Sequence, residues 1–181
     1  SATLDFNEHS EVIKSTLAIV NKRIPVIAGS GANSTSEAIH LTQRSKELGA
    51  DACLLVTPYY NKPTQNGLFA HYKKIADEVS IPQILYNVPG RTSVDMLPDT
   101  VERLSVHPNI IGIKESSSDI GLITSFIDET PDDFSVLVGS APSFYASLVS
   151  GAVGGVLALA CVLPELCVDL FDLVNSGRYR E

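Results

Sequence analysis

The stretch Ile110-Ile111-Gly112-Ile113-Lys114-Glu115 is a short apolar run that ends in two charged residues. Apolar runs of this length are typical of strands buried on both faces of a parallel sheet. If Lys114 points inward with Ile110 and Gly112, burial disfavours its charged form, and a neutral amine attacks carbonyl carbons to form imines. The alternative is a lysine that extends from the strand end into solvent. The stretch therefore indicates a buried strand and one candidate nucleophile.

Segments with strand and helix patterns alternate along the chain on both sides of this stretch. Strands are predicted at residues 24–29, 52–56, 81–86, 110–115, 135–138 and 155–160. Helices are predicted at residues 1–21, 34–48, 67–80, 98–106, 120–129, 142–150 and 164–174. One strand–helix unit every ~25–30 residues is the rhythm of a parallel sheet covered by helices.

Two α/β architectures have this rhythm. A doubly wound sheet normally carries a glycine-rich phosphate turn after its first strand, and Gly29-Ser30-Gly31-Ala32-Asn33 lacks the third glycine of that turn. A (β/α)8 barrel has eight units in typically ~250 residues. The 181 residues here hold six predicted strands and open on a helix. We therefore predict a single domain over residues 1–181 that is an incomplete (β/α)8 TIM barrel, with strands three to eight.

Composition limits the class of partner. The net charge of -8 and the isoelectric point of about 4.9 argue against nucleic acid and anionic membranes. No run of 18 apolar residues occurs in the sequence, and we expect neither a membrane-spanning segment nor a signal peptide. Three sparse cysteines (Cys53, Cys161 and Cys167) predict free buried thiols and a reducing compartment, by default the cytoplasm. The cysteines and histidines show no metal-type spacing, so we expect no metal ion.

The chemistry of a barrel lies at the carboxyl ends of its strands. In this chain those ends carry one lysine, one arginine and three tyrosines, namely Lys114, Arg91, Tyr59, Tyr60 and Tyr86. Tyrosine can relay protons and arginine binds carboxylates, which an imine-forming lysine needs when it acts on an α-keto acid. Each residue also has a structural interpretation: Tyr86 as the cap of a core layer, Arg91 as a surface charge, and the tyrosine pair as an oligomer contact.

Four separate motifs carry a resemblance to a known family. They are Ile-Pro-Val-Ile-Ala-Gly-Ser-Gly-Ala-Asn (24–33), Thr-Pro-Tyr-Tyr-Asn-Lys-Pro (57–63), Leu-Tyr-Asn-Val-Pro-Gly-Arg-Thr (85–92) and Ile-Ile-Gly-Ile-Lys-Glu (110–115). In one register they resemble the dihydrodipicolinate synthase branch of the N-acetylneuraminate lyase family. The resemblance implies a (β/α)8 class I aldolase that is usually a homotetramer and needs no cofactor beyond its covalent imine.

The resemblance also implies a role for individual residues. Lys114 would form an imine with pyruvate, and Tyr86 would relay protons. Tyr60 would reach into the site of a neighbouring subunit, and Arg91 would bind the carboxylate of L-aspartate 4-semialdehyde. Backbone groups would line the pyruvate pocket at Gly139 and Val156. The implied reaction is condensation to 4-hydroxy-tetrahydrodipicolinate, in lysine and diaminopimelate biosynthesis.

Regulated members of the family bind free L-lysine at a subunit interface near the active site. The matching positions here are Ser1, His9, Asn33, Glu37 and Tyr59. Glu37 suits an ammonium group, Asn33 a carboxylate, and Tyr59 the wall of such a site. Glu37 is also the expected capping-box partner of Ser34, and His9 has the alternative of facing a helix interface.

Two departures from the family pattern keep alternatives open. The Gly-Thr-Thr-Gly-Glu turn that holds the pyruvate carboxylate would precede Ser1 and is absent, as are its strand and a C-terminal helical extension. A non-catalytic fragment is therefore one alternative, and with two open sheet edges we expect imine formation to be weak at best. The second departure, Gly139-Ser140-Ala141-Pro142 with the apolar run to Leu163, is closer to 4-hydroxy-2-oxoglutarate aldolases, whereas the Arg91 motif favours the synthase.

Overall fold

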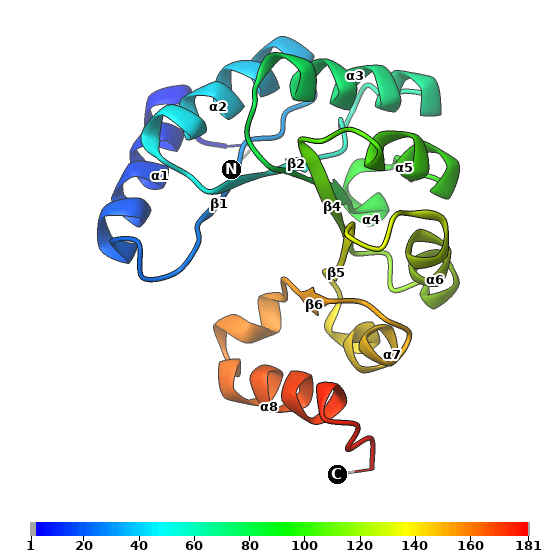
Figure 1. The fold of residues 1–181 in the computed structure, drawn as a ribbon. Helices are drawn as coiled ribbons and strands as arrows, with labels where there is room; N and C mark the ends of the chain where they lie inside the picture. Colours follow the sequence, from blue (N-terminus) through cyan, green and yellow to red (C-terminus); the bar gives the residue numbers. More distant parts are fainter. Residues whose placement is uncertain (1–2, 181) are drawn as a thin grey trace.

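A computed structural model describes residues 3–180 as a curled parallel sheet with helices on its outer side (Figure 1). The six strands are β1 (Ile27–Gly29), β2 (Ala52–Val56), β3 (Gln83–Asn87), β4 (Ile110–Glu115), β5 (Ser135–Val138) and β6 (Gly154–Gly155). All neighbouring strands pair in parallel, and their order in the sheet is their order in the sequence. A doubly wound sheet would reverse its strand order at a switch point. The predicted incomplete (β/α)8 barrel is therefore confirmed.

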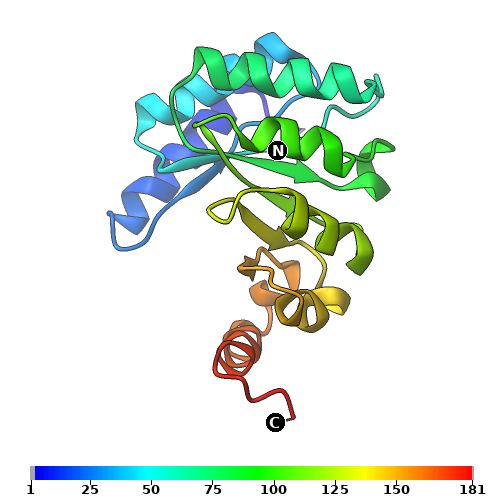
Figure 2. The ribbon, with the colours of Figure 1, turned by 45° about the vertical axis from the view of Figure 1, so that its right-hand side comes forward.

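The helices follow one another around an arc from α1 to α8, which Figure 2 shows from a second side. The α-helices are α1 (Phe6–Val20), α2 (Thr35–Leu48), α3 (Gln65–Glu78), α4 (Pro89–Thr92), α5 (Pro98–Ser105), α6 (Ile120–Glu129), α7 (Phe144–Val149) and α8 (Pro164–Asn175). Short 3-10 turns occupy Ala141–Ser143 and Ala158–Cys161. None of the helices within residues 3–180 is long and apolar enough to cross a membrane.

Local sequence signals account for the helix ends. Asp5 begins α1, where its side chain accepts hydrogen bonds from the N–H groups of Asn7 and Glu8, and the Glu8 carboxylate in turn accepts from Asp5 N–H. This reciprocal capping box satisfies donors that the first turn leaves free. Gly49 ends α2 at a φ of 96°, a conformation that a residue without Cβ adopts at no steric cost. Helix α4 was not predicted, because four residues are too few to show a period.

The main core lies between the sheet and the helices. Leu55, Leu85, Ile113 and Val136 pack there against helix residues such as Phe126. Because successive strand residues point to opposite faces, Tyr86 and Lys114 point to the concave face. The predicted partnership of Lys114 with Ile110 is wrong. A register shift pairs Ile110 with Gln83 and Gly112 with Ile84, and Ile110 joins the helix-side core.

The two edge strands are shorter than predicted. The first has three residues and begins at Ile27, and the last has two and gives way to a 3-10 turn. Each edge strand pairs with one neighbour, so less of its apolar sequence is held in a ladder. The prediction of three buried thiols is likewise corrected: Cys53 is buried, whereas Cys167 is half-buried and Cys161 is exposed beyond the β6 edge.

Candidate active site

Lys114 and Tyr86 lie side by side near the carboxyl ends of β4 and β3. The two residues are direct partners in the parallel ladder. Lys114 Nζ lies 4.0 Å from the centre of the Tyr86 ring, and both side chains are half-buried. The negative face of an aromatic ring attracts an ammonium group at this distance. The structure therefore brings the predicted nucleophile and the predicted proton relay together.

Gly139 leaves room for the stem of Lys114. It follows β5, and its N–H donates to the Glu115 carbonyl at 2.6 Å. A Cβ at this position would overlap Ser116 Oγ and come within 2.9 Å of Lys114 Cε. Glycine at this position is thus a condition for the observed placement of both neighbours.

Ser116 is a candidate residue that sequence reasoning did not single out. Its hydroxyl is buried and has no hydrogen-bond partner among residues 3–180. It lies against Gly139, on the same side as the stem of Lys114. The only sequence signal is its spacing of two residues from Lys114, which gives both the same parity on the strand.

The residues that follow the Lys114–Tyr86 pair meet on the opposite face of the sheet. Asn87 and Glu115 are both completely buried, and Asn87 Nδ2 donates to Glu115 Oε2 at 2.6 Å. The second Glu115 oxygen accepts from the N–H of Ser117. Burial raises the pKa of Glu115, and the hydrogen bond from Asn87 opposes that shift. Sequence reasoning missed this pair, although a charged residue inside a buried strand is itself a signal.

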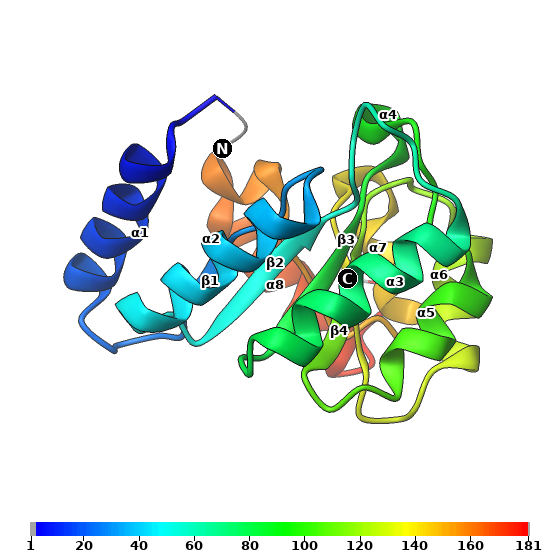
Figure 3. The same ribbon diagram turned by 90° about the horizontal axis from the view of Figure 1, so that it is seen from above.

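Arg91 lies on α4, at the end of the sheet where β3 ends (Figure 3). Its side chain is exposed and forms no hydrogen bond or ion pair within the described residues. The neighbouring Thr92 is buried, and its hydroxyl lies within hydrogen-bond distance of the carbonyls of Val88 and Val94, at 3.2 and 3.0 Å. The helix is thus fixed through Thr92, and the guanidinium remains available to a ligand.

The tyrosine pair is divided between two environments. Tyr59 is half-buried and lines a cavity, whereas Tyr60 is 91% exposed at a φ of 71°. A positive φ is uncommon for a residue with a side chain, and here it turns Tyr60 away from the fold. The structure does not bring Tyr60 to Lys114 within the chain.

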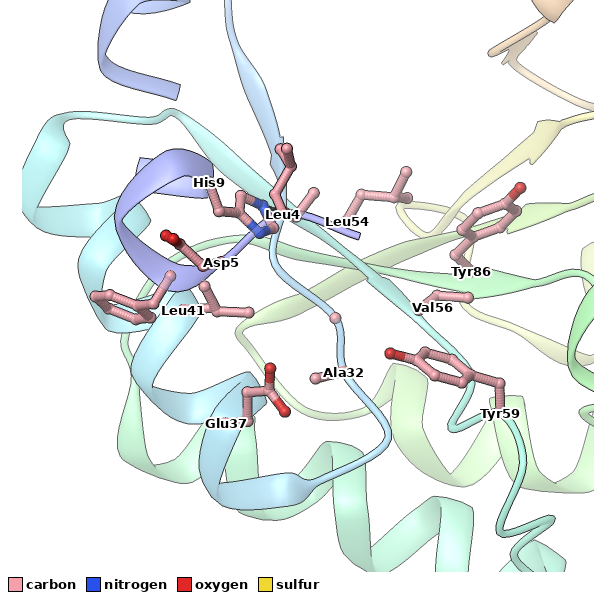
Figure 4. Close-up of a pocket in the computed structure, with 13 residues that line it drawn as sticks. Leu4, Asp5, His9, Ala32, Glu37, Leu41, Leu54, Val56, Tyr59 and Tyr86 are labelled. Carbon is pink, nitrogen blue, oxygen red and sulfur yellow. Dashed lines mark hydrogen bonds between the residues drawn. The ribbon is translucent and has the colours of Figure 1, made fainter. Parts of the chain in front are cut away.

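A cavity of about 230 Å³ lies between α1, α2 and the first strands of the sheet (Figure 4). His9 and Glu37 line one side of it, and Tyr59 and Tyr86 line the other. His9 Nε2–H donates to the Gly29 carbonyl at 2.7 Å. The cavity thus adjoins the Lys114 site, because Tyr86 belongs to both.

The predicted lysine-binding residues are only partly brought together. His9, Glu37 and Tyr59 line the cavity, whereas Asn33 lies outside its lining and donates its amide to the Tyr59 carbonyl at 3.3 Å. Ser1 lies outside the described residues. Only half of the predicted capping box between Ser34 and Glu37 is formed. Ser34 Oγ accepts from Glu37 N–H at 3.5 Å, but within residues 3–180 the Glu37 carboxylate does not accept from Ser34 N–H.

The two predicted backbone positions lie at the same end of the sheet as Lys114. Their N–H groups are already bonded, that of Gly139 to the Glu115 carbonyl and that of Val156 to the Val138 carbonyl at 2.8 Å. Val156 follows the edge strand β6 and is 42% exposed. A ligand would therefore meet the Cα and carbonyl groups of these residues.

Comparison with known proteins points to one family. The profile of the dihydrodipicolinate synthetase family matches residues 1–181. The 4-hydroxy-tetrahydrodipicolinate synthase of Stutzerimonas stutzeri (strain A1501) is 58% identical over 177 residues, 98% of this chain and 61% of that relative. The enzyme of the same name from Cellvibrio japonicus (strain Ueda107) is 52% identical over 181 residues, 100% of this chain and 62% of that relative.

Solved structures indicate the same family. The chloride-inhibited dihydrodipicolinate synthase of Acinetobacter baumannii, in complex with pyruvate, superposes with a TM-score of 0.94 at 47% identity, over 97% of this chain and 60% of that one. The chain thus spans about three fifths of the length of these relatives. With the profile match over its whole length and the same fold, the chain belongs to the dihydrodipicolinate synthetase family.

Proposed function

We propose that Lys114 forms an imine with pyruvate and that the product condenses with L-aspartate 4-semialdehyde to 4-hydroxy-tetrahydrodipicolinate. The observation that carries the proposal is Lys114 Nζ 4.0 Å from the Tyr86 ring, at the carboxyl end of a barrel sheet. The names of the relatives and the pyruvate bound to the Acinetobacter enzyme support the substrate. The setting would be lysine and diaminopimelate biosynthesis in the cytoplasm.

The chemistry needs no metal or organic cofactor. The Lys114 amine adds to the keto carbon of pyruvate, and loss of water gives a protonated imine. This imine withdraws electrons, so that loss of a methyl proton gives an enamine whose carbon attacks the aldehyde. Tyr86 is the nearest predicted group to carry the protons. Arg91, which is exposed and without a partner among residues 3–180, would bind the carboxylate of the aldehyde substrate.

The state of assembly bears on how well the chain performs this reaction. Edge strands β1 and β6 each leave one side unpaired within residues 3–180, and the concave face that holds Lys114 is open between them. Because this face is open to water and does not enclose pyruvate against Lys114, we expect slow imine formation. Tyr60, with its outward side chain, suits contact with another subunit of a homo-oligomer, a tetramer in the family. A non-catalytic fragment is the outcome if Lys114 does not react.

The substrate proposal is tested by assaying one preparation with two substrate sets. We expect a higher kcat/KM for pyruvate with aspartate semialdehyde than for cleavage of 4-hydroxy-2-oxoglutarate, and loss of both activities in Lys114→Ala. The aldolase remains the second candidate because Gly139-Ser140-Ala141-Pro142 and the apolar run to Leu163 resemble that branch of the family more closely. A higher kcat/KM for the hydroxy-keto acid would replace the synthase proposal with the aldolase.

A second site is proposed for free L-lysine in the 230 Å³ cavity. Glu37 offers its carboxylate to the ammonium group, and Tyr59 offers an aromatic wall. The test is calorimetry with L-lysine, using Glu37→Ala and the exposed Glu11→Ala as the matched control. Heat that is lost only in Glu37→Ala is expected. The absence of heat at millimolar lysine, or equal heat in both variants, contradicts the site.

A further inference from the structure

Behind the Lys114–Tyr86 pair lies a hydrogen-bonded cluster, buried at Asn87 and Glu115, that the proposed reaction does not use. It consists of Asn87, Glu115 and Asp95, with the backbone N–H groups of Met96 and Ser117. We propose that Asn87 and Glu115 are positioning residues: their hydrogen bond holds Lys114 over Tyr86, and Asn87 also holds the segment that carries Arg91. The inference deepens the proposed function and rests on it for the reaction.

The pairing of the strands transmits the effect of this bond. Tyr86 pairs with Lys114 and Asn87 pairs with Glu115, so the two pairs are consecutive rungs of one ladder. Their side chains point to opposite faces of the sheet. A bond of 2.6 Å between Asn87 and Glu115 therefore fixes the register that places Lys114 Nζ beside the Tyr86 ring.

Both N–H groups and the oxygen of the Asn87 amide are hydrogen-bonded. Its two N–H groups donate to Glu115 and to Asp95 Oδ1 at 2.7 Å, and its Oδ1 accepts from Met96 N–H at 3.0 Å. Asp95 and Met96 close the segment that begins with α4 and bears Arg91. One side chain thus joins the lysine strand, the tyrosine strand and the arginine segment.

Burial makes these contacts hard to replace by water. Asn87 and Glu115 are 0% exposed, as is Met96. A buried polar group that loses its partner is strongly unfavourable, so the chain would rearrange to satisfy it. The rearrangement would displace the neighbouring rung, and misplacement of reacting groups by ~1 Å can slow a reaction about a hundredfold.

The decisive experiment reverses the polarity of the pair. Asn87→Asp sets two carboxylates against each other, and Glu115→Gln leaves too few acceptors for Asn87 and Ser117. In the double variant, the glutamine amide introduced at position 115 can donate to the aspartate introduced at position 87, while its carbonyl accepts from Ser117 N–H. The register bond is restored, but the introduced aspartate has no N–H for Asp95. We therefore expect the double variant to recover the Lys114 geometry and to lose the link to the Arg91 segment.

The first readout needs no activity. Lysines are methylated reductively with 13C-formaldehyde, and the Lys114 signal is assigned with Lys114→Arg. In the unchanged protein the Tyr86 ring should shift this signal upfield of the other dimethyl-lysines. The shift should collapse in each single variant and in Tyr86→Leu, and return in the double variant. Gln83→Leu, a buried polar change at the other end of β3, controls for stability loss alone and should keep the shift.

Two further readouts separate the two parts of the proposal, which are the positioning of Lys114 by the Asn87–Glu115 bond and the fixing of the Arg91 segment by the Asn87–Asp95 bond (the Asp95 branch). The rate of borohydride trapping with pyruvate should fall about tenfold to a hundredfold in the single variants and recover in the double variant. Asp95→Ala, at an exposed position, should keep the 13C shift but accelerate tryptic cleavage after Arg91 roughly threefold or more, because the segment opens more often. If either buried single variant fails to fold, Asp95→Ala still tests the Asp95 branch, and the double variant compared with Tyr86→Leu tests the Lys114 geometry.

The outcomes are distinguishable. An unshifted Lys114 signal in the unchanged protein, native shifts in both single variants, or a double variant that regains its Tm without the shift would overturn the proposal. Unchanged cleavage after Arg91 in Asp95→Ala would overturn the Asp95 branch. A shifted signal that follows this pattern, with no pyruvate trapping in any protein, would reject the proposed function and leave the positioning role standing.

Discussion

The position of the Lys114 side chain depends on Gly139, which has no side chain of its own. Ser116 Oγ and the aliphatic part of Lys114 occupy the volume that a Cβ at position 139 would fill. In Gly139→Ala the added methyl group would push Lys114 away from Tyr86, so pyruvate trapping should fall at least about tenfold with a smaller effect on Tm. Adding Ser116→Gly removes the overlapping hydroxyl and should recover part of the rate. Trapping at the original rate in Gly139→Ala would show that the stem has room elsewhere.

His71 is a buried imidazole whose protonation couples pH to stability. Its Nδ1 bonds Thr35 Oγ1 at 2.9 Å, its Nε2 has no partner within residues 3–180, and burial lowers its pKa to about 4. In the unfolded chain the pKa is ~6.5, so the unfolded state binds the proton more tightly. Neutral His71 therefore contributes its full share to the free energy of unfolding above pH ~6.5. This share is lost as pH falls towards about 4.

Urea denaturation at pH 7 and pH 4.5 measures this contribution. The unchanged protein should lose about 2 kcal/mol between the two pH values through His71, and His71→Gln should lack that share. His40→Gln, at an exposed position on α2, is the control and should keep it. The same pH dependence in His71→Gln as in the unchanged protein would contradict the assignment.

Among the elements, those framed by clear turn and capping residues could be predicted best. Strands β2, β4 and β5 and helix α6 have the predicted bounds, because their apolar runs are framed by turn and capping residues. The edge strands were predicted too long, since a strand with one neighbour keeps less of its apolar sequence in the ladder. Tyr60 shows the same limit: its outward direction depends on a φ of 71° that no residue pattern around it indicates.

The first helix offers a test, at this scale, of the observed Asp5 cap. Asp5 accepts from Asn7 N–H at 2.8 Å and Glu8 N–H at 2.9 Å. Asp5→Ala should lower the free energy of unfolding by about 1 kcal/mol, because two first-turn donors lose their partner. Asp132→Ala, an exposed change in a loop, is the control for lost negative charge. An unchanged free energy in Asp5→Ala would mean that solvent replaces the cap at no cost.

For the whole molecule, the alternation of strands and helices was sufficient to predict the incomplete barrel, and the strand ends were sufficient to place Lys114 and Tyr86 at the same end of the sheet. The support of that pair could not be predicted, since Asn87 and Glu115 meet only through the β3–β4 register. Asn33 was predicted to bind a ligand, yet its amide bonds the Tyr59 carbonyl. Side chains that bond the backbone of distant loops carry no periodic signal.

The most direct measurement of the central claim maps the lysine that reacts with pyruvate. The chain is treated with pyruvate and borohydride, digested, and analysed by mass spectrometry, alone and extended at its amino terminus with the two strands, and the helix between them, that the family resemblance predicts. We expect a trace of adduct at Lys114 in the chain alone, about one adduct per chain at Lys114 in the extended protein, and none at that site in Lys114→Ala. An adduct at another lysine, or an extended protein that remains unlabelled at Lys114, would contradict the account.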